Sequence, residues 1–216
     1  MNKKVIGHSV QGRSIEVHEF GTGKKHLHIY GGIHGDEPES VDAVQRLIDL
    51  LNQDEKLYSG KHIFIIPNLN PDGAHLKTRV NGNKVDLNRN FPTENWSEKF
   101  DVPKNNPGIK PISEPEVKAL MNFIKVCPPQ AVLSVHSWEP QINYDGPAQD
   151  LARAMAKKNG YKVTENIGYP TPGSLGTWGR DNHIPTVTLE LPEKAPDYDK
   201  VWNENKEAFL VFLKKA

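Results

Sequence analysis

The sequence alternates between short apolar runs and longer stretches in which apolar residues recur every three or four positions. Runs of the first kind are typical of strands, and the longer spacing is typical of helices. Strands are therefore predicted at 5–10, 14–20, 26–30, 62–67, 131–135 and 184–191. Helices are predicted at 40–53, from 115 to about 124, at 148–158 and at 198–214. Because strands alternate with helices after the first pair, the pattern predicts the α/β class.

Three local signals refine this plan. The first two strands flank Gln11-Gly12-Arg13, a sequence typical of a hairpin turn. The run 62–67 is almost continuously apolar, which predicts a buried strand and helices on both faces of the sheet. Ser113 is predicted to cap the helix that follows it, with Pro115 in the first turn.

The segment from Asn68 to about Gly108 differs from the rest of the chain. It is rich in Asn, Pro, Gly and charged residues, and it shows little periodicity. It is also far longer than a typical connection between elements. Loops of this length are usually either functional or disordered, and the pattern alone leaves both interpretations open.

Composition narrows the possible partners. The 216 residues are enough for one domain with a substantial core, and the 27 basic and 27 acidic residues give a net charge of zero. No general attraction to nucleic acid or membrane is implied, so a ligand must be recognised locally. The single cysteine, Cys127, excludes an intramolecular disulfide. Together with the absence of an apolar signal core before Gly7, it predicts a cytoplasmic location, or a periplasmic one if a leader has been removed.

Polar residues with metal-binding chemistry follow two of the predicted strands. His34 and Glu37 form an H-x-x-E pair after the strand at 26–30, and His136 ends the strand at 131–135. Open sheets bind ligands beyond their strand ends. Two imidazoles, one carboxylate and an open position make a catalytic zinc site, although other divalent ions can occupy such ligands. A lone histidine is more often an ordinary loop residue, so the prediction of one Zn²⁺ per chain depends on further motifs.

Those motifs are present in order. The first, Gly31 to Glu39 (GGIHGDEPE), closely resembles the first metal motif of the zinc carboxypeptidases, the family that includes pancreatic carboxypeptidase A. The stretch that follows resembles the substrate-binding region of that family: NPDG at 70–73, Thr78-Arg79, and VDLNRNFP at 85–92. His136-Ser137 and TLEL at 188–191 complete the set. The resemblance implies a single catalytic domain over residues 1–216, with a central mixed sheet of about eight strands between two helix layers.

The resemblance also implies roles for individual residues. Asn88 and Arg89 would bind the terminal carboxylate of a substrate, and Arg79 would stabilise the oxyanion formed on the attacked carbonyl. Glu190, near the end of an apolar strand, would act as general base on a water bound at the metal. Tyr169 lies in a sequence similar to the mobile tyrosine loop of the family, where it could hydrogen-bond the substrate or transition state.

The NPDG, VDLNRNFP and Tyr169 to Gly176 sequences resemble the short bacterial form of the family. That form cleaves the γ-D-glutamyl-meso-diaminopimelate bond of murein tripeptide in peptidoglycan recycling, so a small murein peptide is the expected partner. Diaminopimelate carries an ammonium group and a second carboxylate, and Glu139, Asp145 and Arg180 are candidates for binding them. Three alternatives remain: a murein-trimming carboxypeptidase of another specificity, an aspartoacylase-like acyl-amide hydrolase, and a binding module without turnover.

Overall fold

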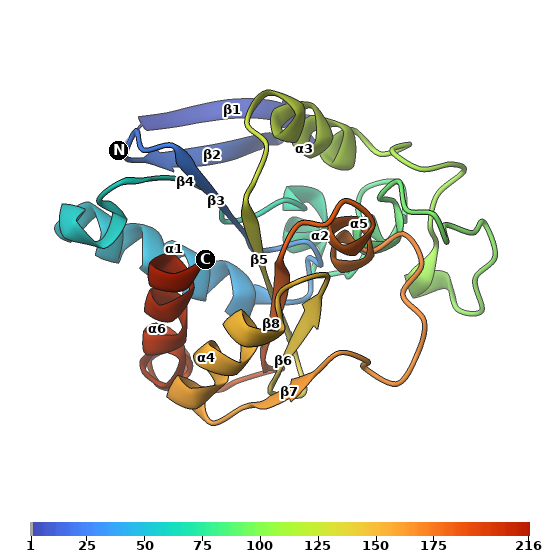
Figure 1. Ribbon diagram of the computed structural model, residues 1–216. Helices are drawn as coiled ribbons and strands as arrows, with labels where there is room; N and C mark the ends of the chain where they lie inside the picture. The colour runs from blue at the N-terminus through green and yellow to red at the C-terminus, as the bar shows by residue number, and fades with distance from the viewer. Residues whose placement is uncertain (1) are drawn as a thin grey trace.

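The computed structural model describes residues 2–216, and the strands within that range form an eight-stranded mixed sheet (Figure 1). The order across the sheet is β1-β2-β4-β3-β5-β8-β6-β7. The strands are β1 (Asn2–His8), β2 (Ser14–Phe20), β3 (Lys25–Tyr30), β4 (Lys61–Ile66), β5 (Ala131–Trp138), β6 (Gln141–Asp145), β7 (Lys162–Thr164) and β8 (Thr186–Pro192). The four central strands β4, β3, β5 and β8 are parallel, so their carboxyl ends share one edge.

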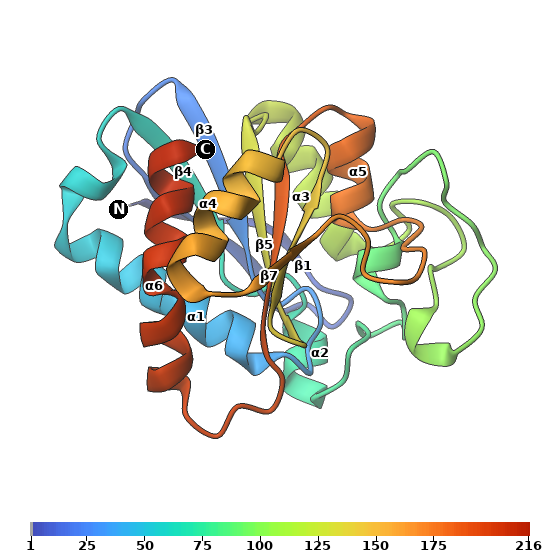
Figure 2. The same ribbon diagram turned by 60° about the horizontal axis from the view of Figure 1, so that its bottom comes forward.

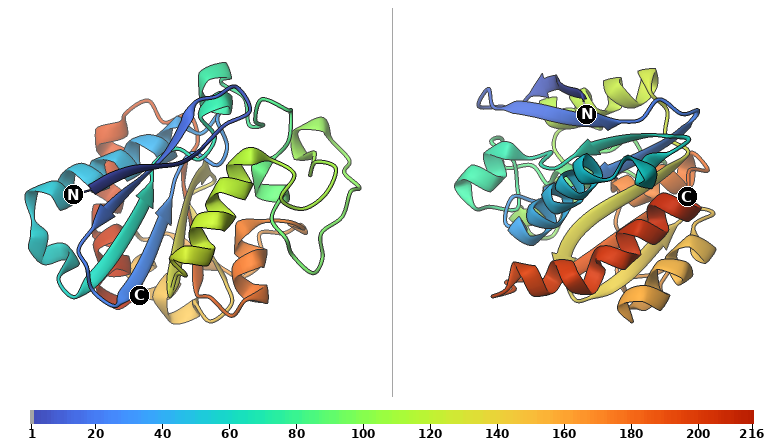
Figure 3. Two further views of the ribbon diagram at one scale, coloured as in Figure 1. Left: turned by 90° about the horizontal axis from the view of Figure 1, so that it is seen from above. Right: turned by 90° about the vertical axis from the view of Figure 1, so that its left-hand side faces the viewer.

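Helices cover both faces of the sheet, as the apolar run at 62–67 predicts. On one face lie α1 (Pro38–Gln53), α4 (Gln149–Asn159) and α6 (Tyr198–Lys215) (Figure 2). On the other lie α3 (Pro115–Val126) and α5 (Leu175–Asp181) (Figure 3). The remaining helical pieces are α2 (Pro71–Leu76) and the short 3₁₀ turns η1 (Glu55–Tyr58), η2 (Leu87–Arg89) and η3 (Pro103–Asn105). The three-layer α/β prediction is confirmed.

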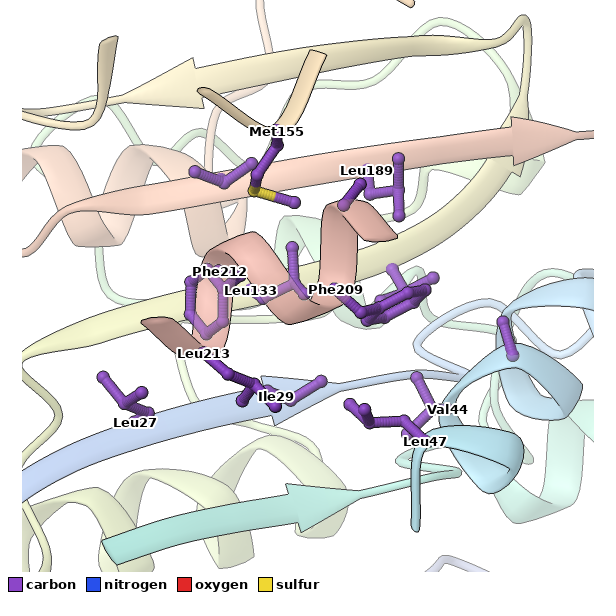
Figure 4. Packing of buried hydrophobic residues seen from close by; sticks show 14 of the residues in the cluster. Leu27, Ile29, Val44, Leu47, Leu133, Met155, Leu189, Phe209, Phe212 and Leu213 are labelled. Carbon is purple, nitrogen blue, oxygen red and sulfur yellow. The ribbon is translucent and has the colours of Figure 1, made fainter. Parts of the chain in front are cut away.

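The larger hydrophobic cluster lies between the sheet and the layer of α1, α4 and α6 (Figure 4). Ile29, Leu133 and Leu189 project from neighbouring strands toward Phe209 and Phe212 of α6. A second cluster fills the opposite face under α3 and α5. Side chains alternate between the two faces along each strand, so the central strands must be apolar on both sides.

The structure departs from the sequence prediction in short elements. The strands β6 and β7 and the helices α2 and α5 were not predicted, because each is short or interrupted by polar residues and glycine. The cap prediction for α3 is wrong. The residue before that helix is Glu114, and the Ser113 hydroxyl donates to the Glu114 carboxylate at 2.8 Å instead of capping the backbone.

The parallel edge brings together the segments that carry the predicted ligands. The chain leaves β3 at Tyr30 and reaches His34 and Glu37 before α1 begins. His136 of β5 is in register with Glu190 of β8, so the two side chains lie side by side on adjacent strands. Across residues 2–216, every helix is too short or too polar to cross a membrane.

Candidate metal centre and substrate cleft

Three buried side chains converge at the parallel edge of the sheet. His34, Glu37 and His136 each offer one ligand atom, and these atoms lie within 4.8 Å of one another. Glu37 Oε1 is 2.6 Å from His34 Nδ1, and Glu37 Oε2 is 2.9 Å from His136 Nδ1. The two Nδ1 atoms are 3.1 Å apart. All three side chains are therefore oriented toward one point.

The chemistry of this donor set fits a zinc ion. Two imidazole nitrogens and one carboxylate leave a fourth tetrahedral position open for water or substrate. Burial raises the pKa of Glu37, but the adjacent His34 and His136 more than offset this and hold that pKa below its ordinary value. An ionised carboxylate between two imidazoles is the form that binds a divalent cation.

Asp86 is a further candidate site residue, to which the sequence motifs assigned no role. It is fully buried, and its Oδ1 is 3.2 Å from His34 Nε2. A carboxylate on the second nitrogen of a metal-binding imidazole fixes its tautomer and orientation. Burial raises the pKa of Asp86, but His34 and Arg79 outweigh it and keep the carboxyl ionised. In the sequence, only the position of Asp86 inside the motif VDLNRNFP indicated that it belongs to the site.

Glu190 lies beside the three candidate ligands and lines the same cleft. Burial raises its pKa to about 7, with a further contribution from Glu37, while His136 and Arg79 act in the opposite direction. A general base works best when its pKa is near the working pH. The environment of Glu190 therefore suits proton transfer.

The cleft has a volume of about 500 Å³, and the four remaining predicted residues line it: Arg79, Asn88, Arg89 and Tyr169. Arg79 Nε donates to Asp86 Oδ2 at 3.0 Å, and Arg79 Nη1 lies 3.7 Å from Glu37 Oε1, which places the guanidinium near the candidate ligands. Asn88 Oδ1 accepts from the Leu175 backbone at 2.9 Å. Because Oδ1 faces the Leu175 backbone, the side-chain amide nitrogen of Asn88 points away from it. Tyr169 is 48% exposed and packs edge to face on Trp138.

The charged groups along the wall of the cleft differ from the candidates taken from sequence. Glu139, Asp145 and Arg180 are not among the residues that line it. Glu139 is exposed, and Arg180 pairs with Asp181 at 2.9 Å. Charges of both signs line it instead, from Asp36, Lys104 and Glu193.

The Asn68 to Gly108 segment supplies much of the site. It contributes Arg79, Asn88, Arg89, Lys104 and Asn105 to the cleft. In Figure 2 its later part forms the long green loop beside the orange connection between β7 and α5, and residue 169 belongs to that connection. Of the two interpretations left open by the sequence, the structure favours the functional one.

A mixed α/β sheet with two histidines and a glutamate at its parallel edge has the ligand set of a catalytic zinc site. The family model described as zinc carboxypeptidase matches residues 1–153, and the chain belongs to this family. It is 36% identical over 197 residues to murein peptide amidase A of Vibrio campbellii, covering 86% of this chain and 76% of that protein.

Two further comparisons agree with this assignment. The chain is 34% identical over 181 residues to murein peptide amidase A of Escherichia coli K12, covering 78% of this chain and 72% of that protein. The crystal structure of murein-tripeptide amidase MpaA from Escherichia coli O157 superposes with a TM-score of 0.84 at 28% identity. That match covers 100% of this chain and 93% of the other.

Proposed function

We propose that the protein is a zinc-dependent amidase that releases the C-terminal residue of a small murein peptide, with the γ-D-Glu-meso-diaminopimelate bond of the tripeptide as its target. The observation that carries the proposal is the convergence of His34, Glu37 and His136 beside Glu190. The murein peptide amidases of Vibrio campbellii and Escherichia coli, at 36% and 34% identity, support the choice of substrate.

In this proposal His34, Glu37 and His136 hold one Zn²⁺ per chain. When bound, zinc supplies Lewis-acid polarisation of the scissile carbonyl and lowers the pKa of a water molecule. Asp86 keeps the His34 ring oriented, through the 3.2 Å contact with Nε2. The carboxylate of Glu190 takes a proton as the water oxygen adds to the carbonyl carbon. Glu190 then delivers that proton to the amine nitrogen as the carbon–nitrogen bond breaks.

The basic side chains of the cleft bind the two negative charges of the reaction. The Arg89 guanidinium forms a two-pronged contact with the terminal carboxylate of the substrate, assisted by the Asn88 amide. The Arg79 guanidinium faces the oxyanion that develops on the carbonyl oxygen. Tyr169, which is half exposed and lines the cleft, hydrogen-bonds the bound substrate or the transition state through its hydroxyl group.

The charge pattern of the cleft supports a substrate with several charged groups. Lys104 lies on the wall with Asp36 and Glu193, so ammonium and carboxylate groups both find a partner of opposite sign. The tripeptide L-Ala-γ-D-Glu-meso-diaminopimelate carries both kinds of group. Since recycling of this peptide takes place in the cytoplasm, we infer the same location for the protein.

The experiment that tests the proposal is mass-spectrometric analysis of products from zinc-loaded protein and L-Ala-γ-D-Glu-meso-diaminopimelate. The Glu190→Gln variant, loaded in the same way, is the matched control. Release of free diaminopimelate by the wild type alone supports both the chemistry and the substrate. Metal analysis of the same samples measures the zinc content per chain.

A substrate panel separates the proposal from its neighbours. Murein tetrapeptides test a trimming carboxypeptidase, and N-acyl amino acids test an aspartoacylase-like hydrolase, for which the clamp of Arg79, Asn88 and Arg89 is also suited. If the enzyme cleaves either class in preference to the tripeptide, the proposed substrate is wrong. The proposed zinc-dependent hydrolysis would still hold. Zinc binding without turnover of any member would favour a binding module.

A further inference from the structure

The loop between Arg79 and Asp86 carries a site residue at each end. Arg79 Nε donates to Asp86 Oδ2 at 3.0 Å, and Asp86 Oδ1 contacts His34 Nε2 at 3.2 Å. The Arg79 carbonyl oxygen accepts from the Gly35 backbone and from Asn70 Nδ2, at 3.3 Å and 3.2 Å. These contacts join the two ends of the loop to each other and to the site, so a change in the turn between them is transmitted to Arg79 and Asp86.

Asn81 holds the middle of this loop. It is 2% exposed, and its Oδ1 accepts from the backbone N–H groups of Asn83 at 3.0 Å and Val85 at 3.1 Å. Its own backbone N–H donates to the Val85 carbonyl at 2.9 Å. One side chain therefore closes the turn from inside.

The other end of the Asn81 amide reaches outside the loop. Its Nδ2 donates to Glu114 Oε2 at 2.7 Å and to Glu116 Oε2 at 3.0 Å. Both carboxylates are buried at the start of α3, 4% and 0% exposed. Within residues 2–216, neither forms an ion pair with a basic side chain. Buried carboxylates require hydrogen-bond donors, and Asn81 supplies one to each of them.

The remaining acceptors of this pair are also occupied. Glu116 Oε1 accepts from the Val10 backbone at 3.1 Å, and Glu114 Oε1 accepts from the Ser113 hydroxyl at 2.8 Å. Glu114 Oε2 accepts a second hydrogen bond from Asn83 Nδ2 at 2.9 Å. Val10 belongs to the tip of the β1–β2 hairpin. The same tip contacts fully buried Asp72 through Ser9 Oγ at 2.7 Å. The loop is thus clamped between α3 and the hairpin, and neither of these lines the cleft.

We infer that Asn81 is a positioning residue for Arg79, and that Glu114 and Glu116 hold it in place from α3. This inference rests on the proposed function, in which Arg79 faces the oxyanion. Interactions made only in the transition state change kcat rather than KM. Loss of the Asn81 contacts should therefore lower kcat and leave binding of the substrate almost unchanged.

The test is a double-mutant cycle of Asn81→Ala and Arg79→Ala on the zinc-loaded enzyme. Asn81→Ala alone is expected to lower kcat roughly 10- to 100-fold, because small displacements of a catalytic group cost that much. KM should change by less than about twofold. In the Arg79→Ala background the same change should lower kcat by less than about threefold, since the group that it positions is absent. An equal loss in both backgrounds would overturn the inference.

Two other variants separate positioning from loss of folding. Glu116→Gln keeps the shape of the side chain, but its amide must face one of two donors, Val10 N or Asn81 Nδ2. Like Asn81→Ala, it should lower kcat and leave KM almost unchanged, but with a smaller loss. It replaces Asn81→Ala in the test if that variant does not fold. Asn205→Ala is the matched control, because Asn205 is also fully buried and hydrogen-bonded, on the distant α6. It should lower stability and leave kcat unchanged.

A crystal structure of Asn81→Ala gives an answer that does not depend on turnover. Displacement of Arg79 from its 3.0 Å contact with Asp86 supports the inference, and an undisturbed contact overturns it. If the wild type cleaves no peptide of the panel, the proposed function is wrong, but the inference about Asn81 is not yet contradicted. The crystal structure then still decides whether Asn81 positions Arg79.

Discussion

Two regions of the molecule are held together in different ways. The layer of α1, α4 and α6 packs on the sheet through apolar side chains such as Leu47, Phe209 and Phe212. The Asn68 to Gly108 segment adds Leu69, Leu87 and Phe91 to the second cluster, but it also depends on many buried polar residues, among them Asp72 and Asn81. Hydrophobic burial is non-directional, whereas hydrogen bonds require defined distances and angles. The apolar layer therefore contributes mainly stability, and the buried polar residues of the segment fix the positions of the side chains in the cleft.

Asn90 illustrates the second kind of order. Its Nδ2 lies within 2.8 to 3.0 Å of the carbonyl oxygens of Pro107 and Lys110 and of the Ser113 hydroxyl. One buried amide thus ties the far end of the segment to the motif that contains Asn88 and Arg89. A buried polar network of this type specifies one conformation when each member is satisfied.

The largest expected effect comes from Glu190, a polar residue on a strand of the sheet. Glu190→Gln should lower kcat roughly 10³- to 10⁴-fold, because the amide cannot accept the proton. Zinc content should stay unchanged, since Glu190 is not one of the three ligands. Steady-state kinetics and metal analysis check both points. Activity within tenfold of the wild type would contradict the role of general base.

Phe209 tests the apolar region. It is fully buried in the cluster between α6 and the sheet. Phe209→Ala should lower the free energy of unfolding by about 3 to 5 kcal/mol, from lost burial and the cavity left behind. The kcat of the folded fraction should remain near that of the wild type. Urea unfolding measures the stability, and kinetics at low temperature measure kcat. A tenfold loss of kcat would contradict the view that the apolar layer affects stability and not the positions of the catalytic groups.

Arg79, in the Asn68 to Gly108 segment, should behave in the opposite way to Phe209, with a large effect on kcat and a small effect on stability. Arg79→Ala should lower kcat roughly 10²- to 10³-fold, the effect of removing one oxyanion donor. Because Asp86 keeps His34 as a partner at 3.2 Å, stability should fall by less than in Phe209→Ala. Arg79→Lys should recover part of the activity, because lysine supplies the charge without the fixed fork. An unchanged kcat in the alanine variant would exclude the oxyanion role.

The smallest expected effect concerns Asp145 on β6. Burial raises its pKa to about 6, only partly opposed by Arg180. A carboxyl with a raised pKa in the folded state favours folding while protonated, so this contribution is present below pH 4 and is lost as the pH rises through 6. Asp145→Asn should therefore raise the free energy of unfolding at pH 8 by about 1 to 2 kcal/mol. At pH 4 the wild type and Asp145→Asn should have nearly the same free energy of unfolding.

Urea unfolding at pH 4, 6 and 8 measures this difference. A stabilisation of Asp145→Asn that is independent of pH would show that packing, rather than charge, is responsible.

The predictability of the fold varied with the length of the element. The central strands and the helices α1, α4 and α6 were predicted within a few residues, because their apolar periodicity is strong. The strand β6 was missed because it has only five residues, and the alternation of Ile142 and Tyr144 with polar residues is too short to distinguish it from a loop. It forms by pairing with β8, where Gln141 faces Glu190. That pairing joins segments far apart in the chain and leaves no local signal.

The amino-acid sequence by itself determined the α/β class, the motifs of the zinc carboxypeptidase family and the side chains that now converge as candidate ligands. Residue types and their order carry this information, because metal binding and proton transfer require particular functional groups. Only the tertiary structure decided that Asp86 contacts His34, that Asp36, Lys104 and Glu193 line the cleft, and that Asn81 joins the Arg79 loop to α3. These contacts join distant segments, and their distances are fixed by packing of the whole chain.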